Sequence, residues 1–275
     1  MSGPGDFRPV DDPESVPVRD AATVVLVRDA PADDTHGAGI EVFLIRRVAQ
    51  MAFAGGMTVF PGGGVDPRDA EADIAWSGPQ PDWWAAQFGS GDSEPLAQSL
   101  VCAAVRETFE ECGVLLAGSG AHDVLSDTSV HDPARGDLVD KTISLAGFLR
   151  DNDLVLRADL LAPLAHWITP LGERRRYDTR FFLAVLPPGQ VADDRTTEAA
   201  SASWHRIDTV MARWRAREAF LLPPTWAQLD HLARFDTVAD LMAAPRTIET
   251  ITPTLISDGS AVRIEFDGSD RYGDL

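Results

Sequence analysis

Three glutamates lie within five positions of one another in the segment RETFEECGV, residues 106–114. They are Glu107, Glu110 and Glu111. If the segment is helical and turns about 100° per residue, the three carboxylates share one side of the helix. The opposite side is apolar and holds Cys102, Val105, Phe109 and Cys112. The pattern therefore predicts a helix that packs one face on the core and gathers negative charge on the other.

Two interpretations of this acidic face remain open. Like charges three and four positions apart destabilise a helix and raise one another's pKa, so something should compensate them. Arg106 can neutralise part of the charge of Glu110, four positions along. A divalent cation would do more, because hard cations prefer carboxylate oxygens. The other interpretation is a solvated acidic face on an acidic protein.

A glycine-rich segment, FPGGGVD at residues 60–66, precedes the predicted helix. Adjacent glycines adopt backbone conformations that other residues avoid, and they let a ligand approach the main chain closely. A glycine run by itself is more often only a turn. Its position before the glutamates favours a loop that works together with them.

The two segments together resemble the signature of the Nudix hydrolase family, which is a glycine, five residues, a glutamate, seven residues and then REUxEExGU, with U aliphatic. RETFEECGV fits the second half, and Gly63 fits the signature glycine. Gly63 and Arg106 lie 43 positions apart, so about 29 residues are inserted within the signature. Gln98 stands where the family has its first glutamate. An interrupted signature of this kind resembles the coenzyme A diphosphatase-like branch, over roughly residues 20–245.

This resemblance implies an α/β/α sandwich around a mixed sheet and hydrolysis of a diphosphate that joins a nucleoside to another moiety. It implies Mg²⁺ or Mn²⁺ as cofactor, held by the carbonyl of Gly63 and by Glu107, Glu110 and Glu111. Arg106 would orient the glutamates through a salt bridge. Glu198, in a loop before a predicted strand, would be a further base or ligand; the alternative is a solvent-exposed loop residue.

Substrate contacts are expected from arginines, because a guanidinium fork matches phosphate oxygens. Arg47 matches an arginine of the branch's upstream motif. A basic cluster follows at Arg174, Arg175, Arg176 and Arg180, with Tyr177 beside it. These arginines either contact substrate phosphate or form internal ion pairs, and Tyr177 either stacks on a base or belongs to the core. Coenzyme A or acyl-coenzyme A is the expected substrate. Nucleotide sugars, NADH, ADP-ribose and dinucleoside polyphosphates are alternatives, and a non-catalytic nucleotide-binding regulator is the alternative of another class.

The elements that must position these residues can be outlined from hydrophobic patterns. Strands are expected at 21–27, 40–47, 161–170, 176–187 and 200–207, and helices at 96–116, within 138–153, at 208–220 and at 225–235. The first two strands should form a hairpin. Residues 250–268 should form a terminal hairpin or arm. Strands and helices alternate irregularly, so the class is α/β or α+β with a mixed sheet.

Domain limits follow from composition. Residues 1–18, rich in Pro and Asp, are expected to be a flexible arm, residues 19–245 the hydrolase domain, and residues 246–275 a C-terminal extension. The tryptophan-rich stretch at 67–96 should be irregular. It is expected to be either a lid over the substrate or a surface subdomain with its own small cluster.

The net charge restricts the binding partners that are expected, and the cysteine content indicates the cellular compartment. A net charge of −19 repels nucleic acid but leaves a small anionic substrate feasible, because a metal can reverse the local sign. No apolar run is long enough for a membrane span.

Cys102 and Cys112 are expected to be reduced core residues in a cytoplasmic protein, since they lie too far apart on one helix for a disulfide. A homodimer is expected from the resemblance alone.

Overall fold

The computed structural model describes residues 12–31, 37–48, 55–71, 73–88, 91–196, 199–257 and 262–273. The strands are β1 (Val18–Ala30), β2 (Gly39–Arg47), β3 (Thr58–Val59), β4 (Gly62–Gly64), β5 (Trp76–Ser77), β6 (Ala117–Gly118), β7 (Val155–Arg157), β8 (Leu161–Ile168), β9 (Arg176–Val185), β10 (Ala199–Arg206), β11 (Thr250–Ile251), β12 (Thr254–Ser257) and β13 (Val262–Glu265). The α-helices are α1 (Pro81–Gln87), α2 (Glu94–Cys112), α3 (Asp132–Val139), α4 (Leu145–Asp151), α5 (Ile207–Arg215), α6 (Pro223–Leu232), α7 (Val238–Ala243) and α8 (Ser269–Tyr272). Short 3₁₀ helices are η1 (Pro13–Ser15), η2 (Pro67–Ala70), η3 (Ser129–His131) and η4 (Ala158–Leu160).

A mixed sheet forms the centre of the molecule, with strand order β10-β2-β1-β9-β8-β11. The short strand β3 pairs with β2, and β4 pairs with β1. Strand β1 runs antiparallel to β2, as the predicted hairpin requires, and parallel to β9. This mixed sheet confirms the expected fold class.

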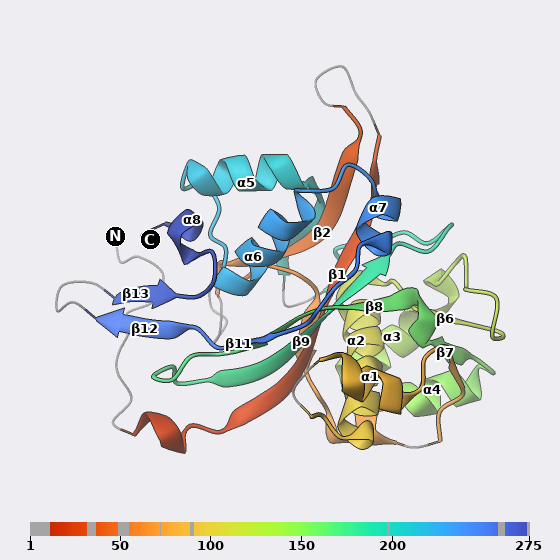
Figure 1. Ribbon diagram of the computed structural model, residues 1–275. Helices are drawn as coiled ribbons and strands as arrows, with labels where there is room; N and C mark the ends of the chain where they lie inside the picture. Colours follow the sequence, from red (N-terminus) through yellow and green to blue (C-terminus); the bar gives the residue numbers. More distant parts are fainter. Residues whose placement is uncertain are drawn as a thin grey trace.

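Helices cover both faces of the sheet, as Figure 1 shows, with α1 to α4 on one side and α5 to α7 on the other. Side chains that alternate along one strand therefore enter different cores. In β9, Phe182 lies in the core under α2, whereas Phe181 and Leu183 lie in the core under α5 and α6. Strand β9 is buried on both faces for this reason.

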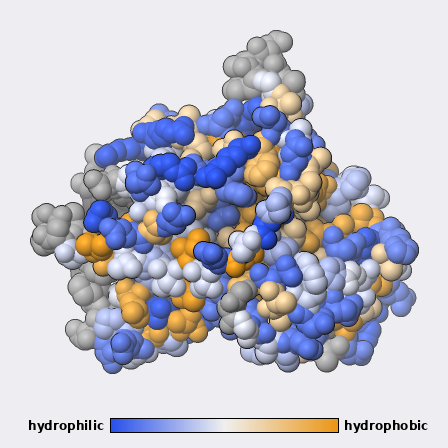
Figure 2. Space-filling view, viewed as in Figure 1, coloured by the Kyte–Doolittle hydropathy of each residue, from blue (hydrophilic) through white to orange (hydrophobic). Residues whose placement is uncertain are grey.

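Each helical layer is held by an apolar stripe on its inner side. In α5, Val210 and Met211 are buried against the sheet. The outer side of α5 is hydrophilic, and in Figure 2 strongly hydrophilic residues gather over this helix. No helix within the described ranges is long and apolar enough to cross a membrane.

The stretch at 67–96 is more ordered than the sequence suggested. It contains η2, β5 and α1, and Trp84 of α1 is fully buried in the core that also contains α2. The Trp84 ring lies 5.5 Å from that of Phe182 of the central sheet. The expected surface subdomain with its own cluster is therefore wrong, because Trp84 and Phe88, four positions apart, anchor α1 in the main core.

The two ends of the chain differ from one another. Of the expected arm at 1–18, residues 1–11 lie outside the described residues, Pro13–Ser15 form η1, and Val18 already begins β1. The expected terminal hairpin is confirmed as β12 and β13. Tyr272 then packs in the core of α5 and α6, and its hydroxyl donates to the carbonyl of Leu221 at 2.8 Å.

Candidate active site

Helix α2 carries the three glutamates, and its sequence defines both ends. The hydroxyl of Ser93 accepts a hydrogen bond from the backbone N–H of Leu96, which caps the first turn. Gly113 ends the helix in the left-handed conformation at φ 73°, which a residue with a side chain avoids. The expected apolar face is buried as predicted, and Cys102 and Cys112 are both buried and free.

The acidic side of α2 is not solvated. The Glu107 and Glu110 side chains are each 13% exposed, and Glu111 is buried. This side faces β4 and η2 instead of water. The interpretation of a solvated acidic face is therefore wrong, because the glycine loop and the stretch at 67–71 cover the helix.

The glycine strand β4 lies directly against the glutamates. The backbone N–H of Gly62 donates to Glu111 Oε2 at 2.7 Å. A methyl group added at Gly63 would overlap the Glu107 carboxylate as it stands, so the glycine lets this carboxylate lie directly against the main chain. Pairing of β4 with β1 fixes this approach, with Gly63 opposite Ala22. The fold thus joins the two segments that lie 43 positions apart in the sequence.

Arg106 links the carboxylates to one another. Its Nε and Nη2 each donate to Asp69 at 2.9 Å, and Nη2 also donates to the carbonyl of Gly64 at 3.0 Å. Its Nη1 donates to Glu107 at 2.7 Å and to Glu110 at 3.3 Å. All five N–H groups of the guanidinium are therefore used. The side chain is only 7% exposed, as expected for a residue that orients others.

One arginine does not balance the negative charge of this site. Burial raises the pKa of Glu107 to about 7, although the charge of Arg106 opposes the shift. Burial also raises the pKa of Glu110. These carboxyls are hard to ionise in the free protein, so a further cation beside them would stabilise their ionised form. Their all-oxygen donor set suits a hard divalent ion. Within the described ranges, no three His, Cys, Asp or Glu side chains already form a metal-holding cluster.

Two aspartates that the sequence analysis did not assign to the site support it. Asp66 caps η2 by accepting from the backbone N–H of Arg68, and Asp69 accepts in return from the backbone N–H of Asp66. Asp69, 3% exposed, is also the main partner of Arg106. The signal was present as Asp-Pro-Arg-Asp, a helix-start pattern with reciprocal capping.

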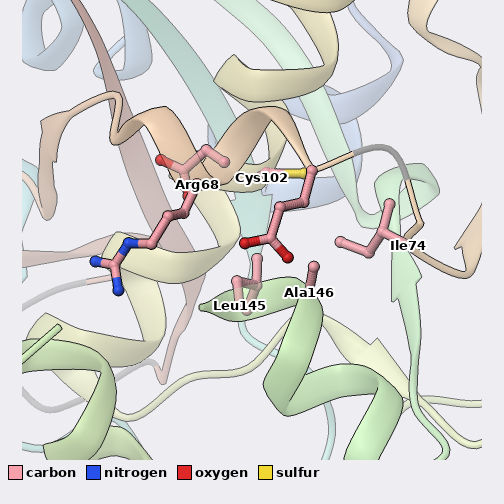
Figure 3. A pocket seen from close by; sticks show the side chains of 7 residues that line it. Arg68, Ile74, Cys102, Leu145 and Ala146 are labelled. Atoms are coloured by element: carbon pink, nitrogen blue, oxygen red, sulfur yellow. The ribbon is translucent and has the colours of Figure 1, made fainter. Parts of the chain in front are cut away.

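The surroundings of η2 are closely packed. A recess beside η2, lined by Arg68, Asp69, Glu71, Ile74, Cys102, Leu145 and Ala146, has no room for a water molecule. In Figure 3 the Arg68 side chain points away from Cys102 and Ile74. Gln98, which replaces the first glutamate of the signature, donates from Nε2 to the carbonyl of Glu71 at 3.1 Å. Gln98 therefore supports the loop after η2 from α2.

The remaining predicted residues are spread along the same end of the sheet. Arg47 ends β2, and Arg176 and Tyr177 begin β9, where both are half-buried. Arg174 and Arg175 are exposed in the turn before β9. Arg176 lies opposite Val18, which is four residues, or roughly 13 Å, along β1 from the partner of Gly63. Glu198 lies outside the described residues.

Arg180, the fourth member of the basic cluster, forms internal ion pairs. Its side chain is 2% exposed and contacts Asp20, Asp92 and Asp178. For this residue the alternative of internal pairing is correct. Arg180 lies two positions before Phe182 in β9 and so faces the layer that contains α1 and α2, whereas Arg174 and Arg175 lie in the turn before the strand.

A cavity of about 150 Å³ lies elsewhere, between the β2–β10 edge and α5. Its lining includes Arg46, Ser203, His205, Arg213 and Phe220. Glu218 and the apolar side chains of Leu44 and Val210 also line it, and none of the predicted site residues does. No sequence pattern indicated this cavity, because its lining residues come from four separate segments of the chain.

Several known proteins are similar to this chain in sequence or in fold. The family model of the NUDT19 Nudix domain matches residues 77–234. The protein named acyl-coenzyme A diphosphatase NUDT19 from Gallus gallus is 28% identical over 271 residues, which covers 81% of this chain and 70% of that protein. The protein of the same name from Homo sapiens is 27% identical with the same coverage. The crystal structure of a NUDIX hydrolase from Alicyclobacillus acidocaldarius superimposes with a TM-score of 0.68 at 28% identity, covering 84% of this chain and 97% of that one.

Proposed function

The chain belongs to the NUDT19 Nudix domain family, and from this premise we propose that it hydrolyses the diphosphate of coenzyme A or acyl-coenzyme A. The products would be 3′,5′-ADP and phosphopantetheine or its acyl derivative. One observation supports the proposal: Glu107 and Glu111 of α2 lie against Gly63 and Gly62, which brings together the two halves of the signature that are far apart in sequence. Two relatives named acyl-coenzyme A diphosphatase support the choice of substrate.

Nudix hydrolases use divalent metal ions, which neutralise the diphosphate and activate the attacking water. We assign the ligands to Glu107, Glu110, Glu111 and the Gly63 carbonyl, and the ion to Mg²⁺ or Mn²⁺. Arg106 holds Glu107 and Glu110 in place, and Asp69 holds Arg106. Phosphoryl transfer depends mainly on such positioning and charge neutralisation. Glu198 is proposed as the further base or ligand.

In the reaction, the oxygen of a water molecule bonds to one phosphorus of the diphosphate, and the bond between that same phosphorus and the bridging oxygen breaks. The departing phosphate keeps the bridging oxygen. A carboxylate takes the proton of the water, and Glu198 is the residue proposed for this role.

The substrate would extend from the glutamates toward the beginning of β9. Arg174 and Arg175 are exposed there, and Tyr177 is half-buried. A distance of roughly 13 Å along β1 is comparable to the length of a nucleotide. We therefore keep Arg47, Arg174, Arg175, Arg176 and Tyr177 as proposed substrate contacts, with the arginines directed at the phosphates.

A product assay tests the proposal directly. The purified chain is incubated with Mg²⁺ or Mn²⁺ and a panel of coenzyme A, acetyl-coenzyme A, NADH, ADP-ribose, a nucleotide sugar and a dinucleoside polyphosphate. The expected result is preferred cleavage of the coenzyme A compounds, with 3′,5′-ADP released. Preferred cleavage of another compound would replace the substrate and retain the hydrolase. Absence of products with both metals would favour a nucleotide-binding regulator instead.

Three further expectations stay predictions, and the first two have simple tests. A homodimer would elute at twice the mass of the 29.7 kDa chain in size-exclusion chromatography with light scattering. Fractionation of cells would test the cytoplasmic location. Nucleic acid is expected not to bind, because a net charge of −19 repels phosphate chains.

A further inference from the structure

Lys141 is the only lysine of the chain and lies in the turn between α3 and α4. Its backbone is left-handed, with φ 58°, which costs free energy for a residue that has a side chain. Such conformations persist where the surrounding structure imposes them. The position of Lys141 is therefore fixed by its contacts and is not simply that of an exposed turn residue.

Arg68 imposes this position. Its Nη1 donates to the carbonyls of Lys141 at 2.8 Å and Ile143 at 3.1 Å. The other side of the same guanidinium binds Asp66, through Nε at 2.9 Å and Nη2 at 3.2 Å. Arg68 thus clamps the turn of Lys141 onto the residue that begins η2.

The ammonium group of Lys141 lies at the rim of the glutamate site. Its Nζ is 3.2 Å from Asp66 Oδ2, and Asp66 and Asp69 cap η2 together. Asp69 in turn holds Arg106, which contacts the glutamates. A chain of polar contacts through Asp66, Asp69 and Arg106 therefore links Lys141 to the glutamates.

The cationic side chains near the glutamates differ in how many of their N–H groups are still available to donate a hydrogen bond. Arg106 has used all five of its N–H groups, and Arg68 has used four. Lys141 uses one of its three on Asp66, and its side chain is 67% exposed. Of these three cations in the described part of the chain, Lys141 has the most capacity to bind an incoming anion.

We propose that Lys141 is a substrate-binding residue whose ammonium donates hydrogen bonds to a phosphate oxygen of the diphosphate. This inference rests on the proposed diphosphatase function and adds a contact to it. A diphosphate that approaches a chain of net charge −19 meets repulsion at most of the surface, and a fixed cation at the rim reduces it. The competing explanation is that Lys141 only pairs with Asp66 to hold the turn.

Steady-state kinetics with coenzyme A separate these explanations. Lys141→Ala is expected to raise KM about tenfold while kcat changes less than threefold, because a charge-assisted hydrogen bond to bound substrate is lost. Lys141→Arg should restore most of the affinity, since the charge returns. Arg150→Ala is the matched control: Arg150 is an exposed cation of α4, 56% exposed, and its removal should leave KM unchanged.

A spectroscopic measurement makes the test independent of turnover. Reductive methylation with ¹³C-formaldehyde labels one side-chain amine in this chain, besides the N-terminal amine, and keeps its charge. Addition of α,β-methylene-ADP with Mg²⁺, a diphosphate that resists hydrolysis, should shift the Lys141 signal and saturate. A signal that does not move, together with an unchanged KM in Lys141→Ala, would overturn the proposal.

The two proposals fail in distinguishable ways. If the wild-type chain cleaves coenzyme A and Lys141→Ala behaves like the wild type, only the role of Lys141 is lost. If the wild-type chain cleaves no member of the panel, the diphosphatase function is lost and the proposal for Lys141 falls with it. A lower melting temperature in Lys141→Ala with unchanged KM would mean that the residue only holds the turn.

Discussion

Two arginines of this protein, Arg106 and Arg180, are buried among carboxylates on the same side of the central sheet, yet their surroundings differ. Arg180 contacts Asp20, Asp92 and Asp178, which come from three separate segments. Arg106 contacts Glu107 and Glu110 of its own helix and Asp69 of η2. The first arrangement ties distant parts of the chain together, whereas the second concentrates carboxylates on one helix.

The pKa shifts differ between Asp178 of the first cluster and Glu107 of the second. For Asp178, burial acts to raise the pKa, but the hydrogen bond with His166 and the charge of Arg180 outweigh it, so the pKa is lowered. Burial raises the pKa of Asp20, at the open end of the same cluster. For Glu107, burial prevails over Arg106, and the pKa rises to about 7. A buried carboxylate with a low pKa stabilises the fold, and one with a raised pKa is a candidate for chemistry.

The largest expected effect is on catalysis. Glu110→Gln should lower kcat on coenzyme A by at least about 10³-fold, because a proposed metal ligand is lost. The melting temperature should stay the same or rise slightly, since a buried negative charge is removed. Glu94→Gln, on the exposed first turn of the same helix, is the control and should keep full activity. Unchanged rates in Glu110→Gln at saturating metal would remove Glu110 from the site.

Substitution of Arg180 is expected to lower stability and to retain turnover, which is the opposite of the result expected for Glu110→Gln. Arg180→Met should lower the free energy of unfolding by about 3–5 kcal/mol, because it leaves buried aspartates unpaired. Urea denaturation measures the loss, and Arg174→Met in the exposed turn nearby is the control. Turnover per folded molecule should be retained. A stability equal to that of the wild type would show that the Arg180 cluster does not hold the fold together.

A divalent metal is expected to bind the glutamates around Arg106 and not the aspartates around Arg180. Added metal therefore tests the comparison without a substitution at Arg180. Mg²⁺ or Mn²⁺ at 100 times its Kd is expected to raise the melting temperature by roughly 5–10 °C, since binding to the folded state adds about 2.7 kcal/mol. The shift should be largely lost in Glu110→Gln. Differential scanning fluorimetry with a chelator as reference measures it. An equal shift in both proteins would place the ion elsewhere.

The smallest effect is expected from the exposed arginines that precede Arg180 in sequence. Arg175→Ala should raise KM severalfold for coenzyme A, which has an additional 3′-phosphate, and less for its dephosphorylated form. Stability should not change, because exposed charges contribute little to it. KM values for the two compounds provide the comparison. Equal changes for both would exclude Arg175 from contact with the extra phosphate.

Much of this site follows from the sequence because it depends on local order. The periodicity of RETFEECGV sets the two sides of α2, and Gly113 sets its end. The hydrophobic pattern at 176–187 predicted a strand, and β9 spans Arg176–Val185. The resemblance of RETFEECGV and the glycine run to the Nudix signature indicated the family. These features repeat over short distances along the chain, so they can be recognised without a fold.

Other features could be decided only by tertiary packing. The burial of Glu107 and Glu110, the role of Asp69, the anchoring of Trp84 and the clamp of Arg68 on the turn of Lys141 all join segments that are far apart in sequence. Strand pairing and helix packing determine which of these segments meet, and no local pattern encodes it. The sequence alone therefore determined which groups are available for chemistry. The tertiary structure decided which of them are desolvated together, and desolvation shifts their pKa values.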